Sequence, residues 1–436
     1  MRFAHTVFAL LLLAPPAWAQ SIPHPPLNEA EAVRLGLARG ELAELEQGAL
    51  GAAEADALAA GQRPNPVLSY DYDRTGGLSD SVEHNLMLSQ TFDPAGRRDF
   101  RRQAAERRLA AVGAGNAGRR AEIAAEIRRE FHSALYRQAV ARASETWVQR
   151  FTRIETLVAR LTRSGEASGY DRRRLARERV ASEARLAGER AELELALSRL
   201  GALIGKPDLA AVAGELSPPP LPDLAIALGR VEQRSELVAL ARRAEAADLD
   251  GRASGKGWMP ELTLGIGPKW VDNGISRDSG IALSLAMPLP VFDRQQAGRQ
   301  RATAEAMQLR AEYRLARTRA EGDLRGLHRQ TEQLRAAAAD YRARAVATLP
   351  DLLRIAELAY QGGESSLLEL LDAYRGALDS EIAALDLEQR ARAARIEYDL
   401  LSNQSLGRPE IDLPPSGGGS KEVFEPGAQP ITGSTE

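Results

Sequence analysis

Short stretches of strict alternation interrupt a chain that otherwise follows helical periodicity. In "PELTLGIGPKWVD" (260–272), Leu262, Leu264, Ile266 and Trp270 fall on one face, while polar or small residues fall on the other. A period of two is that of a strand with two unlike faces. The stretch therefore predicts a β-strand that is wetted on one side only.

Three further segments alternate in the same way, and each lies near a turn rich in Gly or Asn. Their apolar positions are Leu68, Tyr70 and Tyr72 in the first, Leu86 and Leu88 in the second, and Ile281, Leu283 and Leu285 in the third. Two strands joined by a turn form a hairpin. The pattern predicts one hairpin at 66–93 and another at 260–291.

The order of elements occurs twice, with a period of roughly 195 residues. In each half a helical run ends at a proline, a hairpin follows, and helical pattern then continues for some sixty residues, or about 90 Å. A Gly-containing turn and a returning helix complete the half. Trp147, Phe151, Ile154, Val158 and Leu161 repeat at spacings of four and three, which predicts a coiled-coil seam.

The repeat suggests a division of the chain into five parts. These are a signal peptide at 1–19, a first repeat at 20–205 with a tip turn at 163–171, a Pro-rich connector at 206–223, a second repeat at 224–405 with a tip turn at 360–369, and a flexible C-terminal tail at 406–436.

The N-terminus predicts export. Arg2 precedes an apolar run from Val7 to Leu13, and Ala17-Trp18-Ala19 has the small-x-small pattern that signal peptidase cleaves. The chain contains no cysteine, so a lipoprotein anchor, disulfides and thiolate metal sites are all excluded. After the signal, no apolar run approaches the ~20 residues of a membrane helix.

If the protein lies in a membrane, its strands must therefore span the bilayer. Four strands of about ten residues are long enough to cross when tilted, but they cannot close a barrel. Small barrels need about eight strands, and an open edge in lipid leaves backbone groups unpaired. The sequence thus predicts a barrel that several copies of the chain share.

Composition argues against other functions. The 57 basic and 60 acidic side chains nearly cancel, so there is no electrostatic case for a nucleic-acid partner. The five histidines are scattered without the spacing of metal ligands, and no catalytic triad order or phosphate-binding loop is found. We expect no enzyme activity, no cofactor and no bound metal.

With these features assembled, the chain resembles the TolC family of outer-membrane efflux proteins over nearly its whole mature length. The resemblance rests on the duplicated order of elements and on "RPNPVLSYDYD", "DPAGRR", "LPVFDRQQAGRQRA" and "YQGGESSLLELLDAYRGAL". The third motif is most similar to the CzcC-like branch that works with heavy-metal pumps. Gln295 stands where that branch has Asn, and an extra Ala precedes Gly298.

The resemblance implies a mainly α fold with a small β part. Long coiled-coil helices would form a periplasmic α-barrel, and the four strands of each chain would contribute to a twelve-stranded transmembrane β-barrel in a homotrimer. It also implies an outer-membrane location in a Gram-negative bacterium, a periplasmic adaptor (membrane fusion protein) as partner, and an inner-membrane transporter of the resistance-nodulation-division (RND) type. The twelve apolar strand positions named above would then face lipid.

The resemblance further implies a periplasmic gate. Carboxylates six and nine positions after the turn glycine point into the narrowed end of such tunnels. Counted from Gly363, these two positions are Glu369 and Asp372. Counted from Gly165, the sixth position is Asp171, but the ninth is Arg174. Tyr360 matches the pattern just before the second turn. Adaptor docking is implied at the tip turns, at Gly165, Gly363, Glu364 and Ser365.

Other interpretations remain open at this stage. The acids could simply be first-turn residues that complement the helix dipole. The hairpins could pack on the helices of a soluble protein, in which case the chain would be a periplasmic coiled-coil adaptor or scaffold. With the channel fold retained, the cargo could instead be organic compounds or a secreted protein.

Overall fold

The computed structural model describes residues 26–76, 80–165 and 168–403. The expected signal peptide and C-terminal tail lie outside these ranges, as do residues 77–79 of the first hairpin turn and 166–167 of the first tip turn. All elements described below belong to one compact unit that ends at Gln404.

Helices and strands alternate in the order that the repeat predicts. The first half contains α1 (Glu29–Leu37), α2 (Gly40–Gly61), β1 (Val67–Thr75), β2 (Ser81–Phe92), α3 (Arg97–Ser164) and α4 (Gly169–Ile204). The second half contains α5 (Leu224–Gly229), a 3-10 turn (Val231–Gln233), α6 (Ser235–Gly255), β3 (Leu262–Asp272), β4 (Arg277–Ala286), α7 (Gln296–Tyr341), a π-helical turn (Arg342–Val346), α8 (Leu349–Gln361) and α9 (Leu367–Leu401).

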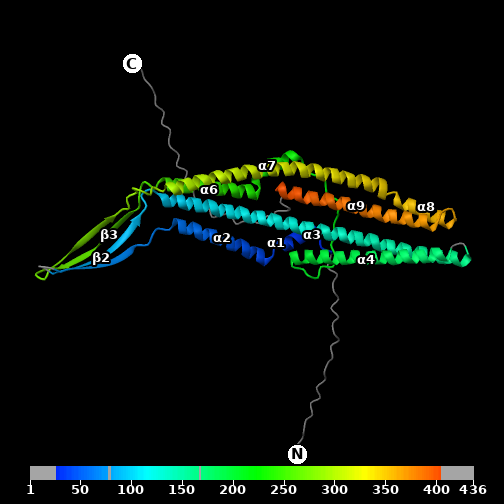
Figure 1. Cartoon of the computed structure of the whole chain (residues 1–436), viewed down its shortest axis with the longest axis horizontal. Helices are drawn as coiled ribbons and strands as arrows, with labels where there is room; N and C mark the ends of the chain where they lie inside the picture. The colour runs from blue at the N-terminus through cyan, green and yellow to red at the C-terminus, as the bar shows by residue number, and fades with distance from the viewer. Residues whose placement is uncertain (1–25, 77–79, 166–167, 404–436) are drawn as a thin grey trace, which may run out of the picture. The chain divides into compact units, whose positions relative to one another are not determined.

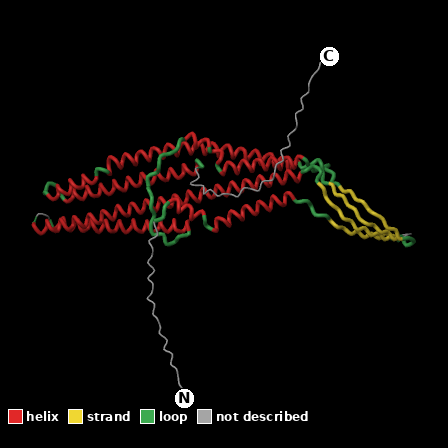
Figure 2. The backbone as a smooth tube through the Cα atoms, turned by 180° about the vertical axis from the view of Figure 1, so that it is seen from behind, coloured by secondary structure: helices red, strands yellow, loops and turns green. Residues whose placement is uncertain are grey.

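The long helices form four adjacent rows. α3, a single helix of 68 residues and about 100 Å, makes one row. On one side of it lie α2 and α4, end to end, and on the other side lie α6 and α9; α7 and α8 pack beyond α6 and α9 (Figure 1). Figure 2 shows the same rows from behind. The layer therefore has two outer rows, α2 with α4 and α7 with α8.

Helix packing relies on narrow apolar seams, as the sequence predicts. Trp147, Phe151, Ile154 and Val158 of α3 are buried, and Leu161 is partly buried beside them. They contact Leu370, Leu371, Tyr374 and Leu378 of α9 in one cluster. Many other buried positions are alanines, so the helices approach closely with few aromatic side chains.

The helical runs break at two places that the sequence pattern did not reveal. The first run divides at Ala38 and Arg39, where the Arg39 guanidinium donates to the carbonyls of Ala202 and Leu203 at the end of α4. The second long run is interrupted by the π-helical turn, because Pro350 in the first turn of α8 cannot continue the backbone ladder of α7.

Both hairpins pair into one antiparallel sheet with the order β1-β2-β3-β4. The central pair joins the two halves of the chain, with Leu88 opposite Ile266 and Phe92 opposite Leu262. The last strand differs from the prediction at both ends. It starts at Arg277, before the first alternating position Ile281, and it ends at Ala286, short of the predicted hairpin end at 291, because Pro288 and Pro290 lack the N–H that a β-ladder needs.

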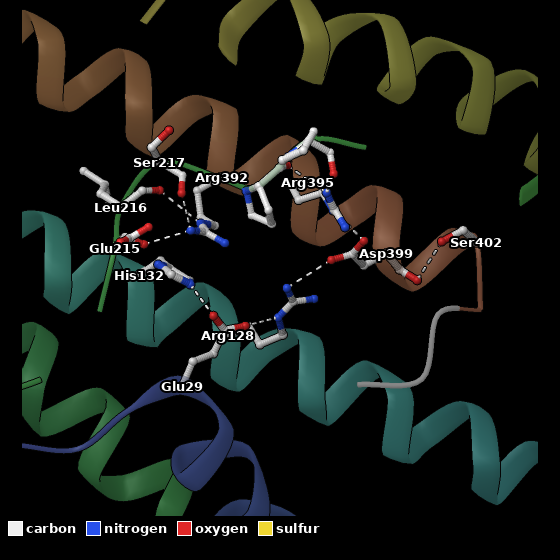
Figure 3. Close-up of polar contacts among 12 residues, drawn as sticks. Glu29, Arg128, His132, Glu215, Leu216, Ser217, Arg392, Arg395, Asp399 and Ser402 are labelled. Carbon is white, nitrogen blue, oxygen red and sulfur yellow. Dashed lines mark hydrogen bonds and ion pairs between the residues drawn. The ribbon is translucent and has the colours of Figure 1, made fainter. Parts of the chain in front are cut away.

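A buried ion network joins the two halves of the chain (Figure 3). Arg128 of α3 donates to Glu29 at the start of α1 over 2.5 Å and to Asp399 of α9 over 3.0 Å. Glu29 also receives a hydrogen bond from His132 Nε2 at 2.8 Å. Arg128 and Asp399 are almost fully buried, so each charge depends on the others for compensation.

Two arginines of α9 extend this network to the connector between the halves. Arg392 donates to the carbonyls of Glu215, Leu216 and Ser217. Arg395 donates to Asp399 and to the carbonyls of Pro219 and Pro220. Residues 215–220 of the Pro-rich connector belong to neither a helix nor a strand. The two guanidinium groups therefore provide the hydrogen bonds that their backbone carbonyls need.

The network makes folding stability sensitive to acid. Burial lowers the pKa of His132. The hydrogen bond to Glu29 and its negative charge oppose this shift, whereas the positive charges of Arg392 and Arg128 add to it. Burial alone would raise the pKa of Glu29, but the hydrogen bond from His132 and the charge of Arg128 outweigh it and lower the pKa to about 2. In both cases the unfolded chain binds a proton that the folded chain does not.

Stability should therefore fall as the pH drops below about 6.5, where unfolded histidine takes up its proton, and fall further from about 4.5 toward 2 as Glu29 titrates. Urea denaturation at pH 7.5 and 5.5 measures the first step. We expect His132→Gln to reduce the difference between the two pH values. His328→Gln, the control on α7, should keep the wild-type difference; an equal reduction in both variants would contradict this assignment.

Candidate functional site

The sheet has one apolar and one polar face. The register places Leu68 opposite Leu88, Tyr70 opposite Leu86, and Leu264 opposite Leu285, so these side chains share a face. All twelve positions expected to face lipid lie there: Leu68, Tyr70, Tyr72, Leu86, Leu88, Leu262, Leu264, Ile266, Trp270, Ile281, Leu283 and Leu285. Most are exposed, with Ile281 and Leu283 each at 77%.

The opposite face carries charges and small residues. Asp71, Asp73, Glu83 and Asn85 lie on it, and Lys269 pairs with Glu83 at 2.5 Å. Gly267 is required where β2 and β3 approach, because a Cβ there would lie 1.8 Å from the Leu86 carbonyl oxygen. This face is suited to water, and the other to hydrocarbon.

The two outer strands, β1 and β4, each have a paired neighbour on one side only within the described residues. Their free edges expose backbone N–H and C=O groups. The outer helical rows have a comparable feature. Their exposed large apolar side chains are Leu45 and Leu58 on α2, Tyr170, Val180 and Leu195 on α4, Met307 and Leu315 on α7, and Leu352, Ile355 and Leu358 on α8.

The inner rows lack such side chains. Among the described residues of α3, α6 and α9, Leu368 in the first turn of α9 is the one large apolar side chain that is exposed. Sequence reasoning missed this contrast, although the apolar stripe of α8 is visible in its 3-residue spacing. The unpartnered apolar surface of the layer therefore lies at its two edges.

Each tip turn contains a glycine with a left-handed backbone conformation. Gly165 ends α3 with φ of 86°, and Gly363 follows α8 with φ of 73°, a backbone conformation that side chains rarely adopt. In the second turn the amides of Glu364 and Ser365 both donate to the Ala359 carbonyl. Glu364 is exposed, whereas Ser365 is partly buried.

Two of the expected gate acids have a structural role at the tips. Asp171 and Ser168 form a capping box at the start of α4, and Glu369 and Ser366 form another at the start of α9. In the second box the Ser366 amide donates to Glu369 over 2.8 Å. The structure thus places both acids in the first helical turn, where they satisfy backbone groups.

Asp372 is exposed on α9 one turn beyond Glu369 and has no part in the capping box. Tyr360 is buried in the aromatic cluster between α3 and α9. Burial raises the pKa of Tyr360, and the charge of Asp171 contributes. The charge of Asp171 in the first tip therefore acts on Tyr360 of the second tip, while Glu369 and Asp372 are exposed in the single chain.

The described part of the chain contains neither a membrane-spanning helix nor a metal centre. Across residues 26–76, 80–165 and 168–403, no helix has the length and apolar character to cross a bilayer. In the same ranges, no three His, Asp or Glu side chains come together as metal ligands. His84 hydrogen-bonds Tyr70 at 2.7 Å and His132 binds Glu29, so these histidines have protein partners.

Known proteins share this arrangement. No model of a protein family matches the chain. The cobalt-zinc-cadmium resistance protein CzcC of Cupriavidus metallidurans is 27% identical over 354 residues, which cover 79% of this chain and 81% of that protein. The outer membrane protein VceC of Vibrio cholerae has a TM-score of 0.70 at 22% identity and covers 86% of this chain and 95% of its own.

The chain thus has the fold of the outer-membrane channels of the TolC family. CusC, crystallised in a study of transmembrane channel formation, has a TM-score of 0.71 at 17% identity, covering 89% of this chain and 99% of its own. The CmeC outer membrane channel of Campylobacter jejuni has a TM-score of 0.68 at 13% identity, covering 92% and 94%. These solved structures confirm the expected fold class, and those of CusC and CmeC are described as membrane channels.

Proposed function

We propose that the protein is the outer-membrane channel of a tripartite efflux system. Three copies would form a passive conduit in the outer membrane of a Gram-negative bacterium. An inner-membrane transporter of the RND type would deliver the cargo, and a periplasmic adaptor would connect the two. The cargo we propose is heavy-metal cations, because the chain is similar to a cobalt-zinc-cadmium resistance protein.

One observation carries this proposal: the chain is a single layer that is open at both edges. β1 and β4 are the outer strands of a four-stranded antiparallel sheet and run in opposite directions, so β4 of one copy can pair antiparallel with β1 of the next. In lipid each unpaired backbone group costs several kcal/mol, so the apolar face can lie in a membrane only when the edges are closed.

The size of the lumen favours three copies over two. Two copies would give eight strands, and side chains fill the interior of a barrel of that size. The inner face here carries Asp71, Glu83, Met87 and Lys269, which need space. Three copies give twelve strands, and their helices give twelve rows, with the apolar edges of α2 and α4 meeting those of α7 and α8.

The tips would carry the gate and the docking surface. Three copies of Asp372 and Glu369 would place carboxylates around one axis, and such rings favour cations. Glu369 would combine this role with its capping box, as would Asp171, and Tyr360 would support the tip from the core. The turns at Gly165, Gly363, Glu364 and Ser365 would meet the adaptor.

A charge on the lipid face should prevent membrane assembly. Leu283 and Ser284 are neighbours on β4, at the same depth but on opposite faces. A lysine on the lipid face near mid-membrane costs about 2–4 kcal/mol, and a lysine in the lumen costs little. We expect Leu283→Lys to lower the yield of trimer in purified outer membranes, with Ser284→Lys as the matched control.

Equal loss in both variants would mean that the faces are assigned wrongly. Recovery of the wild-type chain in the soluble fraction would favour a coiled-coil adaptor and eliminate the channel.

The gate proposal can be tested in planar bilayers. Asp372→Asn removes the charge of a carboxylate that takes no part in a capping box. The substitution should therefore reduce cation selectivity and the block of single-channel current by Co²⁺ or Zn²⁺. Glu364→Gln removes a charge from the same tip at a position outside the proposed ring and should leave both properties unchanged. Unaltered selectivity in Asp372→Asn would remove this residue from the gate.

A further inference from the structure

The segment between β4 and α7 exposes a run of large apolar side chains that the matching segment of the first half lacks. After β2, four residues (93–96) lead into α3, whereas nine residues (287–295) separate β4 from α7. Met287, Leu289, Val291 and Phe292 are exposed, and Phe292 has 92% of its surface accessible. Water is an unfavourable environment for such a run. We call residues 287–292 the junction segment.

The junction segment continues the apolar face of the sheet. On β4 that face carries the alternating positions Ile281, Leu283 and Leu285. Met287 and Leu289 follow at the same spacing of two, and both are exposed as the strand positions are. After Leu289 the chain turns, because the Val291 amide donates to the Leu289 carbonyl over 2.8 Å. The apolar face therefore extends past the last paired residue, toward the helices.

Unpaired backbone groups are costly in lipid, and the junction segment reduces that cost in two ways. Pro288 and Pro290 have no N–H to satisfy. Side chains from outside the segment then bind two of its carbonyls. Arg294 Nε donates to the Pro290 carbonyl over 3.1 Å, and the side-chain amide of Gln296 donates to the Phe292 carbonyl over 3.1 Å. These contacts replace part of the ladder that a strand would need in hydrocarbon.

The height of the apolar face also includes the junction segment. On β3 the face runs from Leu262 to Trp270, eight positions apart, which gives about 21 Å of height for strands tilted by about 40°. Trp270 lies opposite Ser279 of β4. From Ser279 to Leu289 is ten positions, or about 26 Å of height at the same tilt. The longer value agrees with the apolar band of about 25 Å on outer-membrane barrels.

Polar and interfacial residues lie directly beyond the junction segment. Asp293 and Arg294 follow it in the chain, and both are exposed. The turn before β3 approaches them at Gly257, where a Cβ would lie 2.7 Å from the Arg294 carbonyl oxygen. Trp258 in that turn is 59% exposed. Tryptophan and arginine are suited to the boundary between hydrocarbon and water, because each has an apolar body and a polar end.

We propose that the junction segment inserts into the periplasmic leaflet of the outer membrane and contacts the acyl chains of its phospholipids. The inference rests on the proposed function, because the sheet must lie in the membrane for this segment to reach lipid. Leu289 and Phe292 would lie in the hydrocarbon, and Arg294 would reach the lipid phosphates. The competing occupant is the next copy of the chain, whose α2 carries the exposed Leu58 near its end.

Nitroxide labels on single cysteines test the insertion, because the chain has no cysteine of its own. Leu289→Cys and Phe292→Cys are labelled in the full-chain assembly in phospholipid nanodiscs. Electron paramagnetic resonance then measures collisions of each label with oxygen, which concentrates in hydrocarbon, and with a nickel chelate, which stays in water. We expect both labels to collide mainly with oxygen. Ser284→Cys, on the polar face of β4, is the aqueous control and should collide mainly with the chelate.

Each other outcome overturns the proposal in a recognisable way. Few collisions with either reagent at Leu289 and Phe292 would mean that the next copy covers the segment, and a preference for the chelate would mean that water does. Leu283→Cys separates the two claims. If the Leu283 label alone prefers oxygen, the channel stands and only the insertion of the junction segment fails. If the Leu283 label prefers the chelate, the channel fails and the insertion fails with it.

Bilayer thickness provides a second measurement. The double variant Leu289→Gln with Phe292→Gln shortens the apolar band at its periplasmic end. Its trimer should therefore resist heat best in phospholipids with shorter acyl chains than those that suit the wild type. Leu58→Gln, which removes an exposed apolar side chain from α2, should keep the wild-type optimum. An unchanged optimum in the double variant, or an equal shift in both variants, would overturn the proposal.

Discussion

The unpaired backbone groups of β1 and β4 are the constraint on which the whole account depends. A four-stranded sheet with one apolar face has no stable place as a single copy, because water is unfavourable for the face and lipid is unfavourable for the edges. Association of copies solves both problems at once. The helical layer also favours association of copies, although less strongly, because its exposed large apolar side chains lie mainly on the outer rows.

The middle of the helical layer and its tips are held by different interactions. At mid-height, Arg128, Asp399 and Arg392 tie the start of the chain, the connector and both long hairpins of helices into one buried network. At the tips, the returning helices start with capping boxes, and α8 is separated from α7 by a π-helical turn. Arg342 anchors that turn to Glu388 and Glu381.

Much of the fold could be predicted from sequence because its signals are local. Alternation identified all four strands and the apolar face, and 3.6-residue periodicity identified the long helices. The pairing of β2 with β3 could not be predicted, since it joins residues about 180 positions apart and depends on the close approach at Gly267. The ion network was likewise invisible, because Glu29, Arg128 and Asp399 are charged residues in polar patterns that become buried only in the folded chain.

The candidate site shows the same limit. The turn glycines and the acids after them were found from motif spacing, but the capping boxes of Ser168 and Ser366 assign Asp171 and Glu369 a local role as well. The exposed stripe on α8 gained meaning only when the row order placed it at an edge. A sequence shows which residues share a helical face, whereas a structure shows whether another part of the chain covers it.

Disulfide trapping between β1 and β4 tests edge closure most directly, because the chain has no cysteine of its own. Within one copy the two strands are three strand spacings apart, about 14 Å, which is too far for a disulfide. Cysteine pairs are scanned along both strands, with one cysteine on each, and oxidised in outer membranes. The account predicts a ladder of covalent dimers and trimers that ends at the trimer. Absence of covalent oligomers across the scan, or a ladder that stops at the dimer, would contradict it.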